Sequence, residues 1–384
     1  MTAPSAATPS RRDLAAEAAS GGDAGAFRLA AVYGVLHAVV DLCTVTSVFR
    51  AAHRSASALL SPFYLVVGYD VLAFALQFPL GLVVDRLRAA RSALLVGLGS
   101  IAVALLCIPV SATATMVAAG VGNAIFHISA GALVLAASRD RAAPSSVVAA
   151  PAGVYVAPGA LGLGLGMWVG RLSWPVWPLG LLLGAAIVVA ALVRVGPAAP
   201  ATSGTTGGKL GAREWWLALS TLLLSVAVRS FVGFGGPYEV PRTATMMVGL
   251  PLVACAGKLA GGFVADRIGW LEASVGALLV SAPFIAFGGS SPALLLGGLL
   301  LFQTTMPVTL VAVYLLLPDK PATAFGLPCL ALIAGALPTF YPAGKQLYGA
   351  HTFLAMILAS AVAVVVGLRL LGIRRLRASR TGSG

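Results

Sequence analysis

The chain has 384 residues, of which 59% are hydrophobic and only 10% are charged, and its mean hydropathy is +0.96. A soluble core cannot hide this much apolar surface, so the sequence predicts an integral membrane protein. The formal net charge of +13 does not indicate a nucleic-acid partner, because the basic residues stand in short runs between apolar segments and form no single polar face.

Twelve apolar runs follow one another along the chain, each of roughly the 20 residues that a helix needs to cross a bilayer. Before them, residues 1–26 are rich in Ala, Ser and Gly, and we expect a disordered N-terminus. The linker 196–212 is rich in Gly, Pro and Thr and separates the six-helix bundle 27–195 from the six-helix bundle 213–372, which a basic tail at 373–384 follows. The predicted helices are 27–49, 60–84, 92–110, 113–137, 146–170, 174–195, 214–235, 243–265, 270–289, 293–317, 322–343 and 351–372.

Basic residues are distributed unevenly between the two ends of these helices. An N-terminus in the cytoplasm leaves eighteen Lys and Arg side chains on that side and five on the other, with Arg229 and Lys258 inside the membrane. Because cytoplasmic loops of membrane proteins carry the excess of Lys and Arg, we expect both termini and the linker in the cytoplasm. The predicted location is the cell (plasma) membrane, as a multi-pass protein.

A short motif occurs at the same place in both halves. "GLVVDRLRAAR" at 81–91 ends the second predicted helix, and "GGFVADRIGW" at 261–270 ends the eighth. The shared pattern is Gly-x-x-x-Asp-Arg, repeated at a spacing of 181 residues, so the halves are predicted to be parallel copies. The repeated residues are Gly81, Asp85 and Arg86 in the first copy, and Gly262, Asp266 and Arg267 in the second.

The motif resembles the signature Gly-x-x-x-Asp-Arg-x-Gly-Arg-Arg of the major facilitator superfamily, and the resemblance covers all twelve helices. The first copy has Arg88 where the family has Gly, with its further basic residue at Arg91, and the second keeps Gly269. The resemblance implies an all-α membrane protein with two six-helix, parallel-repeat halves around a central cavity. It also implies that the motif residues, Arg91 included, form a charge latch that gates the halves. The alternative is that they are ordinary topological charges.

The fifth predicted helix contains "GVYVAPGALG" at 153–162, which partly resembles the antiporter signature of the same family. Gly153, Pro158 and Gly162 match that signature, whereas Ala157 replaces a Gly. Pro removes one backbone hydrogen bond from a helix, and glycines permit close helix contact. Plain helix packing therefore remains the alternative to a role in transport.

Four ionisable residues fall inside predicted membrane helices: Asp41, Asp70, Arg229 and Lys258. At roughly 2.5–3.5 kcal/mol each, their insertion costs on the order of 10–14 kcal/mol, so they must pair, lose charge or line water. We expect Arg229 to counter one of the two acids, because arginine does not lose its proton in proteins. Lys258 either faces the cavity or extends to the inner interface.

Uncharged polar residues and histidines join them. His37 and Asp41 are four positions apart, as are Asn123 and His127, so each pair shares one helix face. In the resembled fold, the first, fourth, seventh and tenth helices line the cavity, and the tenth carries Gln303. Helix-contact roles are the alternative for these residues. The predicted substrate and proton site comprises His37, Asp41, Asp70, Asn123, His127, Arg229, Lys258 and Gln303.

Within the superfamily, "LHAVVD" and "GVGNAIFH" are most similar to the fosmidomycin-resistance-like, drug-efflux branch. That branch usually follows its second His with Pro-Glu, and here Ile128 and Ser129 stand there instead. Because a carboxylate of the branch is missing, the resemblance does not imply its substrate.

We expect a secondary active transporter that exports a small anionic or amphipathic molecule by alternating access, with protons as the coupling ion and Asp41 as proton carrier, tuned by His37. A nucleotide-binding Gly-x-x-x-x-Gly-Lys-Ser/Thr motif is missing, which excludes direct use of ATP. The alternatives are a proton-coupled uptake symporter of a small organic solute and a lipid-translocating protein. No motif of an enzyme, a cofactor or a metal site is present, and we expect a monomer in the bilayer.

Overall fold

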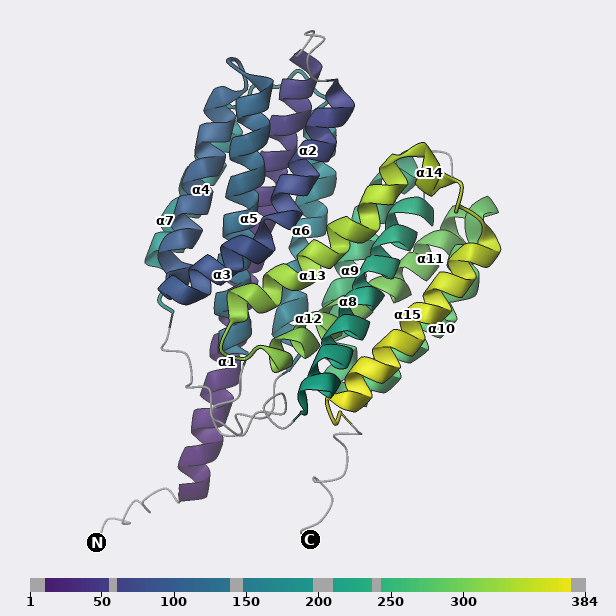
Figure 1. The fold of residues 1–384 in the computed structure, drawn as a ribbon. Coiled ribbons are helices and arrows are strands. Elements are labelled where there is room, and N and C mark those ends of the chain that lie inside the picture. Colours follow the sequence, from purple (N-terminus) through teal and green to yellow (C-terminus); the bar gives the residue numbers. More distant parts are fainter. Residues whose placement is uncertain (1–10, 55–60, 139–147, 196–209, 237–242, 374–384) are drawn as a thin grey trace, which may run out of the picture.

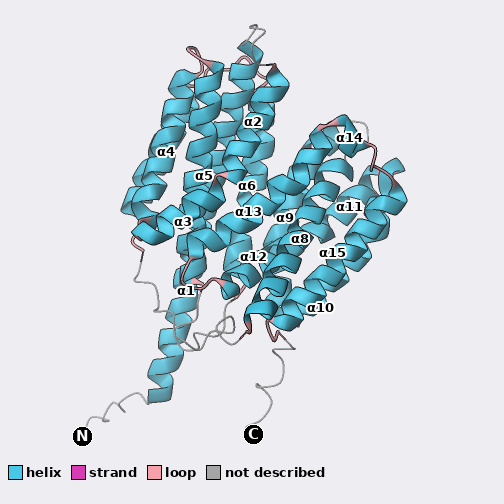
Figure 2. Cartoon of the chain, viewed as in Figure 1, coloured by secondary structure: helices cyan, strands magenta, loops and turns pink. Residues whose placement is uncertain are grey.

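The computed structural model describes residues 11–54, 61–138, 148–195, 210–236 and 243–373, and every regular element within them is a helix (Figure 2). The helices are α1 Arg11–Arg54, α2 Pro62–Ala75, α3 Gln77–Leu87, α4 Ala90–Cys107, α5 Ala112–Ala137, α6 Ala150–Val169, α7 Trp177–Leu192, α8 Ala212–Gly235, α9 Ala244–Ile268, α10 Trp270–Phe287, α11 Pro292–Gln303, α12 Thr305–Leu316, α13 Pro321–Ala336, α14 Pro342–Lys345 and α15 Ala350–Leu370, with 3₁₀ turns η3 Gly288–Ser290 and η4 Leu337–Phe340.

These helices form twelve crossings in the described residues. Eleven spans are long and apolar enough to cross a membrane, and the twelfth, α7, is apolar but only 16 residues long. Two crossings are made of paired helices: α2 and α3 meet at Leu76, and α11 and α12 meet at Thr304. Pro307, near the start of α12, cannot donate the backbone hydrogen bond that would continue α11 without a kink. The twelve-helix prediction is confirmed.

The N-terminal boundary differs from the prediction. The structure starts α1 at Arg11, whereas the sequence analysis expected disorder up to residue 26. The segment "LAAEAAS" at 14–20 is rich in alanine, which has the highest helix propensity, and it joins the membrane helix without a proline between them. The expected disorder of residues 1–10 lies outside the described residues, as do most of the linker 196–212 and all but the first residue of the tail 373–384.

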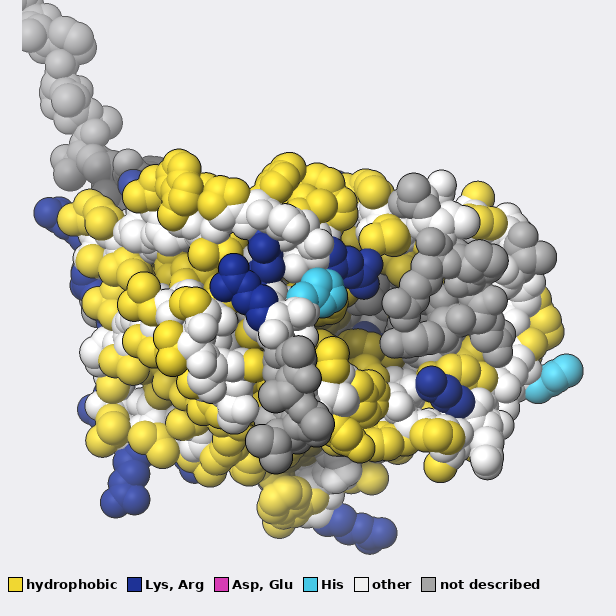
Figure 3. Space-filling model, turned by 90° about the horizontal axis from the view of Figure 1, so that it is seen from above, with side chains coloured by type: hydrophobic (Ala, Val, Ile, Leu, Met, Phe, Trp, Pro, Cys, Tyr) yellow, Lys and Arg dark blue, Asp and Glu magenta, His cyan; other side chains and the backbone are white. Residues whose placement is uncertain are grey.

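Helices α1–α7 and α8–α15 form two bundles that meet at the end of the molecule carrying both termini and diverge toward the opposite end (Figure 1). At the meeting end, α3 packs on α13, and α6 packs on α9 and α12. We call this end the terminal end. Seen from the opposite end, the surface shows apolar, basic and histidine side chains and no acidic ones (Figure 3).

Small residues bring α1 and α6 together inside the first bundle. Gly162 faces the backbone of Ala38 so closely that a Cβ there would overlap it, and a Cβ at Gly166 would lie 3.1 Å from the carbonyl oxygen of Asp41. Close backbone approach through glycine is a common way of packing helices where no hydrophobic effect drives association. The α1–α6 contact therefore fixes the position of the polar face of α1.

Candidate transport site and the latches between the halves

A polar cluster lies in the interior of the first bundle, where α1 contacts α5. His37 and Asp41 project from α1 one turn apart, and Asn123 and His127 project from α5 one turn apart, as their spacing predicts. All four are buried: the most exposed, Asp41, retains 8% of its surface. The structure thus brings four of the predicted site residues together.

Asp41 is the centre of this cluster. Its Oδ2 lies 3.2 Å from His37 Nε2, its Oδ1 lies 3.6 Å from His127 Nε2, and Asn123 Nδ2 donates to Oδ1 at 2.9 Å. A buried carboxylate is costly unless it is paired and hydrogen-bonded. Asp41 meets both conditions within the first bundle alone.

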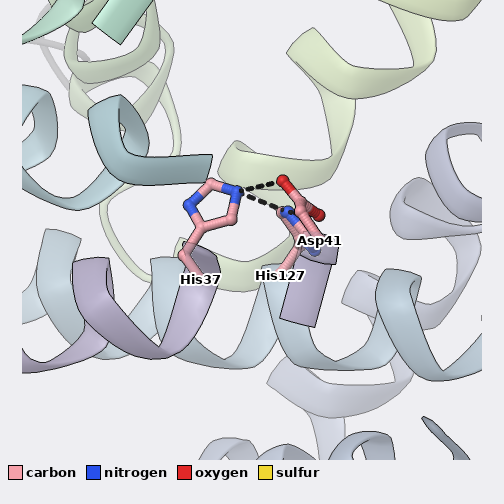
Figure 4. A group of neighbouring side chains, drawn as sticks. All are labelled: His37, Asp41 and His127. Carbon is pink, nitrogen blue, oxygen red and sulfur yellow. Dashed lines mark hydrogen bonds and ion pairs between the residues drawn. The ribbon is translucent and has the colours of Figure 1, made fainter. Parts of the chain in front are cut away.

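The two imidazole rings are held by backbone carbonyls. His37 Nδ1 lies 3.0 Å from the carbonyl oxygen of Tyr155, and His127 Nδ1 lies 2.8 Å from that of Asn123. Because a carbonyl only accepts, each Nδ1 carries the proton of these bonds. Both Nε2 atoms therefore point toward Asp41, and they lie 2.7 Å from one another (Figure 4).

Three residues around the cluster were missed by the sequence analysis. Tyr69 on α2 receives a hydrogen bond from Asn123 at 3.1 Å and lies 2.9 Å from the hydroxyl of Thr44. The Tyr155 hydroxyl donates to the carbonyl oxygen of His127 at 3.1 Å. Thr44 stands three residues after Asp41, so helical spacing could have suggested it, but the two tyrosines looked like ordinary apolar-face residues.

Lys258 lies on α9 of the second bundle, which packs on α6 of the first. It is half-buried and interacts electrostatically with Asp41 and His127. Its backbone packs on α6, where a Cβ at Gly153 would lie 2.7 Å from the Lys258 carbonyl oxygen. The position facing the site stays our prediction for Lys258.

Arg229 forms neither of the acid pairs that we expected. Its guanidinium donates to the hydroxyls of Thr305 and Thr309, the latter at 2.9 Å, and its Nε donates to the Ser225 carbonyl oxygen at 3.3 Å. Pro307 of α12 faces α6 of the first bundle. Thr305 and Thr309 are each two residues from Pro307, which is roughly 200° around the helix, so they lie on the opposite side of α12. Arg229 therefore ties α8 to α12 inside the second bundle, away from the cluster.

Asp70 and Gln303 lie apart from the cluster as well. Asp70 is half-buried on α2 and has no hydrogen bond or ion pair within the part of the chain that the structure describes. It stands on α2, which packs against both α5 and α13. Gln303 packs against α9, where a Cβ at Gly257 would lie 2.9 Å from the Gln303 Cβ.

The first copy of the repeated motif connects the two bundles. Asp85, near the end of α3, accepts hydrogen bonds from the backbone N–H groups of Ala322 at 3.0 Å and Thr323 at 2.7 Å, and from the Thr323 hydroxyl at 2.7 Å. These N–H groups belong to the first turn of α13, where the helix itself supplies no acceptors. The carboxylate thus caps a helix of the opposite bundle.

The second copy does the same in the reverse direction. Asp266 of α9 accepts from the backbone N–H groups of Ala149 at 2.9 Å and Ala150 at 2.8 Å, at the start of α6, and from Trp270 Nε1 at 2.9 Å. We call the two arrangements the Asp85 latch and the Asp266 latch. They are related by the internal repeat and both lie at the terminal end.

The glycines of the motif explain how the latches close. A Cβ at Gly81 would lie 2.8 Å from the carbonyl oxygen of Ala322, and one at Gly262 would lie 2.6 Å from the Cα of Ala150. Only glycine allows these helix starts to come within reach of the aspartates. One turn beyond each Asp the backbone turns left-handed, at Gly269 with φ +109° and at Arg88 with φ +51°.

The arginines of the motif take no part in these bonds. Arg86 and Arg267 are exposed, and no hydrogen bond or ion pair to another described residue involves them. Arg91 donates to the Ala191 carbonyl oxygen at 2.9 Å, within the first bundle. The bonds between the bundles therefore join each motif aspartate to the backbone N–H groups at a helix start. They do not involve an Asp–Arg pair.

The antiporter-like segment of α6 lies between both bundles. Pro158 packs toward Gly34 of α1, Gly162 packs on α1, and Gly153 faces α9 and Pro307. Between them, Gly159 borders the His37 ring, with which a Cβ would overlap. The glycines therefore serve close packing, and one of them leaves room for the cluster.

The cluster also has the chemistry of a metal-binding group, which no spacing in the sequence indicated. His37, Asp41 and His127 each offer one ligand atom, and these atoms lie within 4.8 Å of one another. The sequence analysis predicted no metal site. His37 and Asp41 lie on one helix, but His127 follows His37 by 90 positions on another helix, so the three residues share no short motif.

No family model matches the sequence, and no curated protein matches it. Solved structures do. The fucose:proton symporter of E. coli aligns over 90% of this chain and 98% of its own, with a TM-score of 0.63 at 14% identity. The human organic anion transporter MFSD10 aligns over 88% and 99%, with a TM-score of 0.61 at 17% identity. A second structure of the fucose:proton symporter is described as a major facilitator superfamily transporter in the outward conformation. It aligns over 90% of this chain and 99% of its own, with a TM-score of 0.58 at 14% identity. The chain therefore has the twelve-helix fold of the major facilitator superfamily.

Proposed function

We propose that this protein is a secondary active transporter that moves a small molecule across the cell membrane by alternating access, with export as its direction and protons as the coupling ion. The observation that carries the proposal is the pair of latches. Each holds a helix start of one bundle on an aspartate of the other, and both lie at one end of the molecule. Two bundles that are fastened at one end and diverge at the other form one of the two states of such a cycle.

The charge distribution supports an orientation for the latches. The excess of Lys and Arg at the terminal end favours the cytoplasm for that end. In that orientation the latched state is the one closed toward the cytoplasm. The pairs His37–Asp41 and Asn123–His127 also favour the fosmidomycin-resistance-like, drug-efflux branch, in which export is the expected direction.

Proton coupling has its best candidate in Asp70. Asp41 is already held by two histidines and Asn123, whereas Asp70 has no bonding partner in the described chain. Asp70 stands on α2, which packs against α13 of the second bundle. Within the described residues, Tyr69 is the titratable side chain in electrostatic contact with it. A rocking motion that moves α2 against α13 changes the surroundings of Asp70 and thereby its affinity for protons.

The test uses everted membrane vesicles that carry a respiratory pH gradient, read by acridine orange fluorescence. A substrate that is exported in exchange for protons dissipates the gradient when it is added, and a panel of small anionic and amphipathic compounds supplies the candidates. Asp70→Asn should abolish the dissipation while retaining exchange of labelled substrate across liposomes. Asp319→Asn, an exposed acid in the loop before α13, is the matched control.

Other outcomes of these assays would indicate the alternative functions. Substrate that enters whole cells on energisation, with no response in everted vesicles, identifies the proton-coupled symporter. Movement of a labelled lipid headgroup across liposomes identifies the lipid-translocating alternative. If Asp70→Asn leaves the gradient response unchanged, Asp70 is not the proton carrier.

A further inference from the structure

The cluster on α1 and α5 is the group of potential metal ligands that stands out in the described part of the chain. His37, Asp41 and His127 are buried, and their three ligand atoms converge on one point (Figure 4). We propose that these residues form a binding site for a divalent first-row transition-metal ion such as Zn²⁺ or Co²⁺.

The separations of the ligand atoms fit such an ion. Two ligands bound at 2.0–2.1 Å to a tetrahedral ion are about 3.3 Å apart. The observed separations are 3.2 Å from His37 Nε2 to Asp41 Oδ2, 3.6 Å from His127 Nε2 to the other oxygen, Asp41 Oδ1, and 2.7 Å between the two Nε2 atoms. They bracket the expected value, and the imidazoles need to part by only about 0.6 Å.

The orientation of the rings points to the same occupant. Each Nδ1 donates its proton to a backbone carbonyl, at Tyr155 for His37 and at Asn123 for His127. Histidines that bind metals nearly always donate their other N–H to such an acceptor, which fixes the ring and directs the free Nε2 lone pair to the ion. Here two Nε2 atoms and a carboxylate face one another, an arrangement that repels itself unless a proton or a metal ion lies between them.

The surroundings hold the third ligand as well. Asn123 Nδ2 donates to Asp41 Oδ1 at 2.9 Å, and Asn123 in turn donates to the Tyr69 hydroxyl at 3.1 Å. Gly159 of α6 borders His37, and any side chain there would displace the ring. The ligands therefore have a supporting shell on α2, α5 and α6 before an ion arrives.

The donor set selects the class of ion. Two imidazole nitrogens suit Zn²⁺, Co²⁺, Ni²⁺, Cu²⁺ and Fe²⁺, whereas Ca²⁺ and Mg²⁺ require oxygen ligands in larger number. Three protein ligands leave a coordination position free. An ion at this site can therefore take a water or a donor atom of a small molecule as its fourth ligand.

A substitution of Lys258 should change metal affinity in the opposite direction to a substitution of a ligand. Lys258 belongs to the second bundle and interacts electrostatically with Asp41 and His127. A positive charge in that position opposes a divalent cation. Removing it should tighten metal binding, whereas removing a ligand should weaken it.

The inference rests on the proposed function only for the route by which the ion reaches the interior. Binding is measurable at equilibrium without a gradient, so its outcome is independent of whether the protein transports anything. Conversely, the vesicle assay for substrate-driven proton movement needs no added metal. The two proposals can therefore fail separately.

The experiment titrates Co²⁺ into the full-length protein in detergent, purified through a tag without histidines. Tetrahedral Co²⁺ gives visible d–d absorption, and Zn²⁺ should displace it at one equivalent. We expect His37→Gln, Asp41→Asn and His127→Gln each to weaken binding at least about 100-fold, and Asn123→Ala, which removes a supporting bond, to weaken it about 10- to 100-fold. Lys258→Met should strengthen binding several-fold.

The controls separate the cluster from other donors and from misfolding. His351→Gln changes an exposed histidine at the start of α15 and should leave binding unchanged. Cys255→Ser with Cys329→Ser should also retain it, because the site uses no thiolate. Gly159→Ala keeps every ligand but displaces His37, and it should weaken binding while circular dichroism reports an intact helical fold.

Two results would overturn the proposal. The first is wild-type protein that binds no stoichiometric Co²⁺ or Zn²⁺, which would mean that a proton shared by the two Nε2 atoms is the occupant. The second is binding that survives unchanged in all three ligand variants, which would place the metal elsewhere in the chain.

Discussion

The Asp85 latch leads to a quantitative prediction. Asp85 receives three hydrogen bonds from α13, two of them from backbone N–H groups at the helix start. In Asp85→Asn, one side-chain oxygen and the negative charge are lost, and the new amide group cannot accept. At least one N–H of the α13 start is left without a partner, which costs about 1–3 kcal/mol, and a charge favoured by the helix start is lost, worth about 0.3–1 kcal/mol.

The half-buried position of Asp85 lowers these values, so we expect a net effect of about 2 kcal/mol. At 1.4 kcal/mol per tenfold, the ratio of latched to unlatched molecules falls about 30-fold. The assay is a spin-label distance measurement in a cysteine-free background, with labels at Leu87 and Trp216, which are 67% and 62% exposed and lie at the terminal end of opposite bundles. The variant should populate a longer distance.

Asp266→Asn and Asp319→Asn calibrate this result. Asp266 is exposed and receives only two bonds from the opposite bundle, since its third donor is Trp270 of the neighbouring helix α10. Its variant should shift the distance less than Asp85→Asn does. Asp319→Asn removes an exposed carboxylate near α13 and should shift nothing. If Asp85→Asn keeps the wild-type distance distribution, the carboxylate does not hold the bundles together.

Further predictions concern backbone conformation and packing. Arg88→Gly should stabilise the fold by about 1 kcal/mol, because Arg88 has a left-handed backbone, φ +51°, that glycine adopts without strain; a higher melting temperature in detergent checks it, and an unchanged one contradicts it. Gly335→Ala should destabilise the protein by about 1–3 kcal/mol, because a Cβ there overlaps the Ala227 backbone of α8. Gly184→Ala, on a site with open space around it, is its control. Gly81→Ala should weaken the Asp85 latch and lengthen the same spin-label distance, since a Cβ would press on the start of α13 at 2.8 Å.

The sequence predicted the elements well because each membrane helix is read from length and hydropathy alone. It also predicted which residues share a helix face: His37 with Asp41, and Asn123 with His127. Both follow from the geometry of a single helix. The repeated motif added contacts between distant segments, since two copies at matching positions require matching roles.

Contacts between helices were harder to predict, because periodicity fixes a residue's side only relative to its own helix. Arg229, for example, was expected to pair with an acid of the site, and it forms no such pair. The rotation of α8 directs Arg229 to Thr305 and Thr309 instead, and no pattern within α8 encodes that rotation. Tyr69 and Tyr155 escaped notice for the same reason, since an aromatic residue in an apolar helix is ordinary until its neighbours are known.

The distribution of charge between the bundles suggests how the site communicates with the latches. All three proposed metal ligands belong to the first bundle, so an ion could bind there without any contribution from the second. In the second bundle, Lys258 interacts electrostatically with Asp41. Eight residues further along α9, Asp266 accepts hydrogen bonds from the start of α6. An ion at the cluster would repel Lys258 and push α9 away from α6, against the Asp266 latch. Lys258→Met should therefore remove the effect of Zn²⁺ on the spin-label distance between the bundles while leaving Zn²⁺ bound, and an effect of Zn²⁺ that persists in this variant would show that the ion acts by another route.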